Sequence, residues 1–407
     1  MRLEKRALWA LVLVPAAQVS AYTPAPTIET DILAANGFLN LANYQLKQAF
    51  SGARPTCTLQ NVAVRREWGT LSNEERKDYT DAVLCMLSKP SKFTSAQVPG
   101  AKSRFDDFMA IHMNQTLTIH GTFSFLAWHR YFTWLYEQAL RDECGYKGYQ
   151  PVSISRMTDE ATRLTFTNQY WNWGKYAFDP INSPIFDGSD YSMSGNGEYE
   201  AHNATEGLTT GLNPIPPGPG GGCVKTGPFK NMTVNLGPVT PTLAEPEVHP
   251  ASSLLAYNPR CLKRDVSQWV SSRYTKDSDT GDLIINYNDI SSFQARMQGN
   301  FSAGFYGVHT GGHFTIGGDP GGDLFSSPGD PAFYLHHGQI DRTWWIWQNQ
   351  DMENRKSAIG GTITINNSPP SRNGTLDDMI DMVVNAPPIK ISELLSTTEG
   401  PFCYIYV

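Results

Sequence analysis

Six of the nine histidines in this 407-residue chain form two groups of three whose spacing could hold metal ions. The groups are His112, His120 and His129, and His309 and His313 with one of the adjacent His336 and His337. In the second group two histidines stand four residues apart, so their imidazoles would project from one helix face and could bind one ion together. The first chemistry that the sequence suggests is metal chemistry at nitrogen ligands.

The number of these histidines favours metal ions over a structural role. A single histidine on an apolar helix is usually a hydrogen-bonded core residue. Each buried imidazole needs partners for two ring nitrogens, however, and six of them without a metal would carry a large desolvation cost. A pair of metal ions removes that cost directly.

The type of metal follows from the side chains near the histidines. The nearest carboxylates are Asp106, Asp107, Glu137 and Asp341, and both groups are complete without them. Three neutral nitrogen ligands suit zinc or copper, whereas hydrolytic dizinc and diiron sites usually recruit carboxylates. Because three imidazoles leave positions open and copper, unlike zinc, changes its oxidation state, a copper pair that reacts with O2 is the leading hypothesis.

Helices must position these histidines. Residues 30–50 and 72–88 have apolar residues at helical spacing and are predicted to face the core, and the second segment opens with the capping-box pattern of Ser72 and Glu75. Residues 125–142 carry aromatic residues every three or four positions, which predicts a third helix.

A fourth helix is predicted over residues 330–350, with Asp330 as N-cap and Pro331 at the first helical position. Residues 182–260 are instead rich in Gly, Pro, Ser, Thr and Asn, which predicts an extended excursion, and its two histidines are expected to face solvent. Residues 361–365 resemble a short strand. The predicted fold class is mainly α, with long irregular loops and minor β.

The chain resembles a secreted protein. Residues 1–21 combine a basic start, an apolar stretch too short to span a membrane and a small-residue cleavage site, which predicts a signal peptide. The six cysteines contain no CxxC pair and predict three disulfides, with 15 possible pairings that the sequence leaves open. A disulfide between Cys223 and Cys261 would limit the entropy of the excursion. N-glycans are possible at Asn114, Asn203, Asn231, Asn300, Asn366 and Asn373.

Charge and composition limit the partners. With 40% apolar and 17% charged residues the chain should bury a substantial core, which excludes a disordered polyelectrolyte. The net charge of −7 and the lack of a Lys/Arg cluster argue against nucleic acid and anionic membranes. Small neutral or aromatic substrates remain compatible.

Two segments resemble the copper signatures of the tyrosinase and catechol oxidase family, which holds a type 3 pair of copper ions. They are residues 125–131, FLAWHRY, and 330–342, DPAFYLHHGQIDR. The histidine spacings also match, and Tyr404 and Tyr406 resemble the Tyr-x-Tyr that closes the catalytic domain in this family. The chain looks most similar to the short secreted fungal catechol oxidases.

The resemblance implies a four-helix bundle whose facing helices bind two copper ions. The implied ligands are His112, His120 and His129 for copper A, and His309, His313 and His337 for copper B. His337 is preferred over His336 because the family ligand stands four residues before the aspartate that is here Asp341. Asp341 and Arg342 are implied to hold the copper B helix, and a structural role is expected for Glu137.

The resemblance also implies a substrate pocket with Thr310, Phe314 and Leu324 in its wall. Monophenol-hydroxylating relatives often carry an asparagine at the position of Thr310, paired with a glutamate that holds a water. Gln298 and Asn300 are the nearest analogues here, and a neutral amide is a poor general base. We therefore expect weak monophenol hydroxylation.

The predicted function is oxidation of o-diphenols (catechols) to o-quinones with reduction of O2 to water at a dinuclear copper centre. Residues 22–407 are expected to form one catalytic domain, including the excursion at about 182–260, without a C-terminal shielding domain. The alternatives are a tyrosinase with monophenol hydroxylase activity, an o-aminophenol oxidase, a non-catalytic O2 carrier and a dizinc hydrolase.

Overall fold

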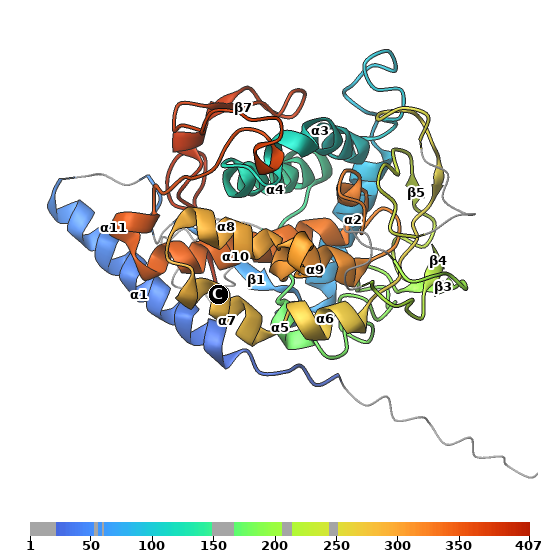
Figure 1. Ribbon diagram of the computed structural model, residues 1–407, viewed down its shortest axis with the longest axis horizontal. Helices are drawn as coiled ribbons and strands as arrows, with labels where there is room; N and C mark the ends of the chain where they lie inside the picture. Colours follow the sequence, from blue (N-terminus) through green and yellow to red (C-terminus); the bar gives the residue numbers. More distant parts are fainter. Residues whose placement is uncertain (1–21, 53–55, 59–60, 149–166, 206–213, 244–250) are drawn as a thin grey trace, which may run out of the picture.

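The computed structural model describes residues 22–407 except for 53–55, 59–60, 149–166, 206–213 and 244–250 (Figure 1). The signal peptide predicted for residues 1–21 lies outside the described residues. Among the helices that are described, none combines the length and the apolar character needed to cross a membrane.

The centre of the molecule is a bundle of four helices. They are α3 (Arg104–Ile119), α4 (Phe125–Cys144), α9 (Gly307–Ile316) and α10 (Ala332–Gln350). α10 runs through the middle of the view in Figure 1 and packs against both α4 and α9. Nearly all of its residues are buried, which explains why its apolar and aromatic side chains surround the whole helix. The mainly α prediction is confirmed.

The helix starts are close to those predicted. α2 (Asn73–Ser88) has the capping box of Ser72 and Glu75. α10 begins one residue later than expected, with Pro331 as the N-cap in place of Asp330. The Asp330 carboxylate still accepts the N–H of Ala332 at 2.8 Å, but it is also bound by the buried guanidinium of Arg264.

α1 (Ile28–Phe50) is a helix as predicted, but it does not face the core along its length. It lies on the outside of α10, and Thr30, Gly37 and Leu41 are its buried residues. The side chains of Leu39, Leu46 and Phe50 are exposed. The core-facing prediction is therefore wrong for these three apolar side chains.

Shorter helices surround the bundle. They are α5 (Trp173–Tyr176), α6 (Gln268–Tyr274), α7 (Asp277–Asn286), α8 (Ile290–Gln298) and α11 (Met352–Arg355). α8 packs directly against α9, so its side chains reach the same end of the bundle as the histidines of α9.

The largest sheet joins distant parts of the chain. β1 (Ala63–Glu67) lies between β2 (Thr167–Tyr170) and β9 (Tyr404–Tyr406), parallel to both, and Arg65 is paired with Tyr406 in the register. This pairing places Tyr404 and Tyr406, near the end of the sequence, against Asp341 on α10.

The excursion folds back on itself through short antiparallel strands. The pairs are β3 (Gly197–Tyr199) with β4 (Gly221–Val224), and β5 (Thr233–Val234) with β6 (Arg260–Cys261). A further pair, β7 (Met379–Ile380) with β8 (Ile389–Lys390), lies near the C-terminus. The strand expected at residues 361–365 is absent from the structure, because this segment makes only an isolated bridge and then a 3₁₀ turn.

Three disulfides confirm the prediction from the cysteine count. They are Cys57–Cys403, Cys85–Cys144 and Cys223–Cys261. The last pair crosses the excursion, a pairing that the sequence had left open, and the first fixes β9 close to the start of β1. Each closed loop restricts the unfolded chain and thereby stabilises the fold.

Candidate metal centre

Seven buried histidines gather in two adjacent clusters inside the four-helix bundle. The first contains His112, His120 and His129, and the second His309, His313, His336 and His337. Within each cluster, one nitrogen of every ring lies within 4.8 Å of those of the others. The clusters face each other, since the rings of His129 and His337 stack with centroids 4.5 Å apart. All six predicted ligands are therefore brought together, with His336 in addition.

The backbone orients the three rings of the first cluster. His112 lies on α3, His120 is its C-cap and His129 lies on α4. Each Nδ1 lies 2.8–3.0 Å from a backbone carbonyl oxygen, that of Phe325, Thr116 or Phe125 respectively. A carbonyl only accepts, so Nδ1 must carry the proton and Nε2 must carry a lone pair.

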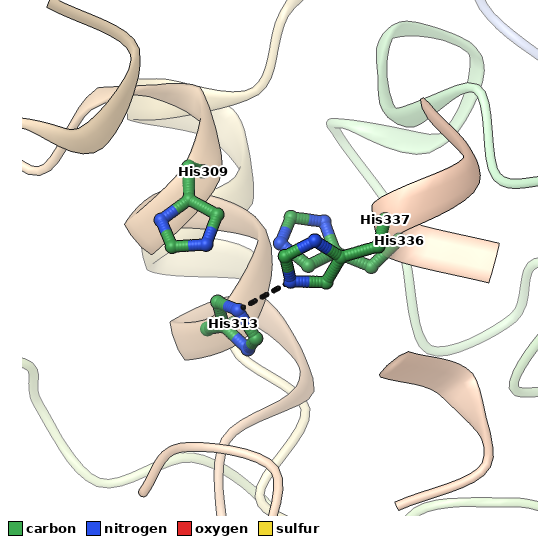
Figure 2. Close-up of side chains that lie close together, drawn as sticks. All are labelled: His309, His313, His336 and His337. Atoms are coloured by element: carbon green, nitrogen blue, oxygen red, sulfur yellow. Dashed lines mark hydrogen bonds between the residues drawn. The ribbon is translucent and has the colours of Figure 1, made fainter. Parts of the chain in front are cut away.

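The second cluster is built from two helices. His309 and His313 are one turn apart on α9, and His336 and His337 lie on α10, as Figure 2 shows. The Nε2 atoms of His313 and His337 are 3.2 Å apart, the contact drawn as a dashed line in Figure 2. Within the described residues, neither nitrogen of His309 has a hydrogen-bond partner. A metal ion would be a partner for the nitrogen that carries the lone pair.

Burial keeps the rings uncharged. Loss of solvent lowers the pKa of His120 to about 4 and that of His313 to about 3. Burial, together with neighbouring imidazoles, also moves the pKa of His129, His309 and His337 well below the usual range. Neutral imidazoles with free lone pairs are the form that binds metal ions.

His336 differs from its neighbour His337. The indole N–H of Trp173 donates to Nδ1 of His336 at 3.1 Å, so that nitrogen is already in use. The ring also packs closely on Gly312, where a Cβ would lie 2.2 Å from its Cε1 atom. These contacts give His336 a packing partner and a hydrogen-bond partner within the protein.

The carboxylates near the clusters are engaged elsewhere. Asp106 closes the capping box of α3, and Asp107 is paired with the buried Arg104. Neither residue belongs to a histidine cluster, and the two groups found in the described residues consist of histidine alone. Neutral nitrogen donors in sets of three fit copper or zinc, and they fit poorly to ions that prefer oxygen.

Asp341 joins the two helices that carry facing histidines. Its carboxylate accepts hydrogen bonds from four buried side chains, those of Arg65, Arg130, Tyr404 and Tyr406. Arg130 directly follows His129, and Asp341 stands four residues after His337. Burial alone would raise the pKa of Asp341, but the charges of the two arginines and the tyrosine hydrogen bonds lower it. The carboxylate therefore stays ionised and holds α4 against α10.

The other residues predicted around the ligands have separate partners. Glu137 is buried between Arg65 and Arg141, which is a structural position. Arg342 does not pair with Asp341; it reaches Asp31 on α1 at 3.4 Å. Arg342 thus links α10 to the outer helix.

A cavity of about 680 Å³ opens onto the histidines. Its wall contains His120, His309 and His313 and the three predicted pocket residues, Thr310, Phe314 and Leu324. The Thr310 hydroxyl donates to the backbone oxygen of Gln298 at 2.7 Å. Sequence reasoning pointed to Gln298 at the end of α8 but missed Ser292, Ala295 and Arg296, because no spacing or motif marks the rest of that helix as part of a site.

His202 in the excursion was expected to face solvent, and this expectation is wrong. Its side chain is only 8% exposed, and its Nε2 lies 2.9 Å from the Asp265 carboxylate. Its Nδ1 lies 2.7 Å from the backbone oxygen of Glu200. The second histidine of the excursion, His249, lies outside the described residues.

Comparison with known proteins agrees with this geometry. Residues 102–350 match the family described as the common central domain of tyrosinase. Tyrosinase P of Aspergillus terreus is 39% identical over 368 residues, which cover 87% of this chain and 95% of that protein. The N-acetyl-6-hydroxytryptophan oxidase of Emericella nidulans is 36% identical over 363 residues, covering 86% of this chain and 93% of the relative.

A solved structure resembles the whole described fold. It is a variant of the polyphenol oxidase from Thermothelomyces thermophila, with a TM-score of 0.83 and 42% sequence identity. The match covers 94% of this chain and 98% of that one.

Proposed function

This chain belongs to the tyrosinase family of oxidoreductases, and we propose that it oxidises o-diphenols to o-quinones while it reduces O2 to water. The observation that carries the proposal is the pair of facing, neutral histidine clusters, each of which contributes at least one ring to the wall of the same cavity. Proteins of this family bind a type 3 dicopper centre, and the donor set here fits two copper ions.

We propose six copper ligands within these clusters. They are His112, His120 and His129 for one ion, and His309, His313 and His337 for the other. The choice of His337 is supported by the hydrogen bond from Trp173, which occupies Nδ1 of His336. When bound, the copper pair supplies the O2-binding and electron-transfer chemistry, whereas the protein fixes the geometry of the ligands.

The protein groups around the cavity favour diphenols as substrates. Asp323 is the carboxylate that lines the cavity, and its oxygens accept the backbone N–H groups of Val239, Thr240, Phe325 and Ser326. The side-chain amide of Gln298 is also occupied, since its oxygen accepts the N–H of Gly121 and its nitrogen donates to Gln294. The oxygens of both groups are already engaged in hydrogen bonds, and a neutral amide is a poor base for a phenol proton.

Monophenol hydroxylation is the second candidate, because the relative from Aspergillus terreus bears the name tyrosinase. Oxidation of o-aminophenols would use the same site on another substrate. Product analysis with catechol, tyrosine and 2-aminophenol separates these activities. We expect rapid quinone formation from catechol and slow turnover of tyrosine, and rapid turnover of tyrosine without a lag would overturn the preference.

Metal analysis of the purified protein tests the proposal most directly. We expect two copper ions per chain, an absorption change on titration with peroxide, and catechol oxidation that is lost when the metal is removed by a chelator. Two zinc ions without such absorption would instead support a hydrolase, and reversible O2 binding without quinone formation would support a carrier.

We further propose that residues 22–407 act as one secreted catalytic domain after removal of residues 1–21. The three disulfides support an extracellular location. Mass spectrometry of the secreted protein would give the cleavage position and show which sequons carry glycans.

A further inference from the structure

The cavity wall contains a cation that the proposed reaction does not use. Arg296 lies on α8 and lines the same cavity as His120, His309 and His313. Among the side chains that line the cavity in the described part of the chain, Arg296 is the one arginine or lysine. A fixed positive charge at this place would attract an anionic group on a molecule that enters.

Two aromatic side chains set the orientation of this guanidinium group. Its central carbon lies 3.8 Å from the ring centroid of Phe305 and 5.5 Å from that of Tyr287. Both rings line the cavity. A guanidinium that stacks on a ring keeps its N–H groups in the plane parallel to the ring, where they can bind a carboxylate in a bidentate way.

The acidic partner of Arg296 holds it only weakly. The contact with Asp282 is 3.5 Å long, and the two side chains are 36% and 41% exposed. Exposed pairs of this kind contribute little to stability, so exchange of Asp282 for a substrate carboxylate costs little. The acid inside the cavity, Asp323, does not compete, because its oxygens accept four backbone N–H groups.

We propose that Arg296 is a specificity residue that binds a carboxylate on the substrate. The preferred substrates are then o-diphenols that carry an acidic side chain. The inference rests on the proposed function and narrows its substrate class. The cavity volume of about 680 Å³ lies within the range of about 300–1,000 Å³ typical of small-molecule sites, so it has room for a substituted ring.

The test compares an acidic with a neutral diphenol in wild type and Arg296→Gln. For 3-(3,4-dihydroxyphenyl)propionate, we expect the variant to raise KM about tenfold with kcat nearly unchanged, because a charge-assisted contact in the bound state is lost. For 4-methylcatechol, KM should change less than about twofold. An equal change for both substrates, or no change for either, would overturn the proposal.

Arg273→Gln is the matched control. Arg273 also stacks on an aromatic ring, that of Trp269 at 4.2 Å, but it does not belong to the cavity wall. We expect this variant to leave KM for both diphenols unchanged. Arg296→Lys should fall between wild type and Arg296→Gln, because it keeps the charge and loses the planar fork.

Calorimetry on the copper-free protein tests substrate binding by Arg296 independently of catalysis. Wild type should bind 3-(3,4-dihydroxyphenyl)propionate about tenfold more tightly than Arg296→Gln does. If neither diphenol is oxidised, the proposed function fails while this binding difference still decides the role of Arg296. Equal binding by the two copper-free proteins would contradict a carboxylate contact at Arg296.

Discussion

The histidines of the metal centre and His202 of the excursion are all covered by protein, yet their environments shift the pKa of the imidazole in opposite directions. In the bundle, burial lowers the pKa of every ring, and the orienting partners of the first cluster are uncharged backbone carbonyls. For His202, burial also lowers the pKa, but the hydrogen bonds to Glu200 and Asp265 and the charges of both carboxylates outweigh it and raise the pKa.

The difference shows that the chemical type of the partner, more than burial, decides what a covered histidine can do. A carbonyl on Nδ1 leaves a neutral ring with a lone pair on Nε2, which suits a metal ion. A carboxylate on Nε2 favours the protonated ring, which has no lone pair to offer. Acid should therefore weaken the metal-free bundle, whose rings must take up protons, and preserve the contact of His202 with Asp265.

The largest expected effect separates two adjacent histidines within the bundle. His337→Ala should remove one copper ion per chain and reduce catechol oxidation to the background rate of the metal-free protein. His336→Ala should keep both ions and most of the activity, because His336 already has Trp173 as a partner. Copper content by mass spectrometry and initial rates with catechol check both variants. Loss of copper in the His336 variant with retention in the His337 variant would reverse the assignment.

The second prediction concerns the carboxylate closest in sequence to His337. Unlike Asp265 beside His202, Asp341 forms its ion pairs with arginines, Arg65 and Arg130. It therefore does not favour protonation of the imidazoles in the bundle. Asp341→Asn leaves the buried Arg130 without its counter-charge and Arg65 with Glu137 alone, so we expect a loss of about 3–5 kcal/mol in the free energy of unfolding. Urea unfolding of the copper-free protein measures this loss.

Asp81→Asn is the control for this variant. Asp81 pairs with Lys77 at 2.7 Å, and the two side chains are 53% and 56% exposed. Removal of an exposed charge of this kind should cost less than about 1 kcal/mol. Similar losses in both variants would show that the buried ion pairs of Asp341 contribute no more to the free energy of unfolding than an exposed pair does.

Much of the fold follows from local patterns in the sequence. Apolar periodicity and capping residues predict α2, α4 and α10 within one or two residues, because these signals act within one or two helical turns. The same periodicity does not show how much of a helix is covered by other elements. The exposure of Leu46 and Phe50 on α1 was therefore not predicted. The parallel pairing of β1 with β9 has no local signal, because its partners are more than 300 residues apart.

The candidate site divides in the same way. The spacing of the histidines and the resemblance of two segments to copper signatures were enough to select the residues that the structure brings together. The partners of those residues were not predictable. Arg65 reaches Asp341 across 276 positions, and His202 reaches Asp265 across 63. Such contacts depend on the tertiary fold, which the sequence pattern does not encode locally.

The smallest expected effect concerns His202 itself. Its pKa in the folded protein is raised above the ordinary value of 6.5, so its contribution to stability is complete below pH 6.5 and is lost as the pH rises through the folded pKa. We expect His202→Gln to lower the free energy of unfolding by about 0.5–1 kcal/mol at acidic pH and by less in alkali. Thermal unfolding of both proteins across the pH range checks this. The charged groups around His202 are Asp265, which contacts its ring, and Glu200, which is itself paired with Lys263. A deficit that grows with pH would contradict the contrast between the two regions.

The contacts of β9 have a consequence for how the protein is made. Tyr404 and Tyr406 donate to Asp341, and Cys403 is linked to Cys57 across 346 positions. At a synthesis rate of about 5–20 residues per second, a ribosome needs at least about 17 seconds to travel between the two cysteines. During that time the nascent chain exposes the edge of β1, and over the last 63 positions before Tyr404 it carries Asp341 without its tyrosine donors. We therefore expect the bundle to close only after translation has passed residue 406, so that copper is acquired after β9 has been made.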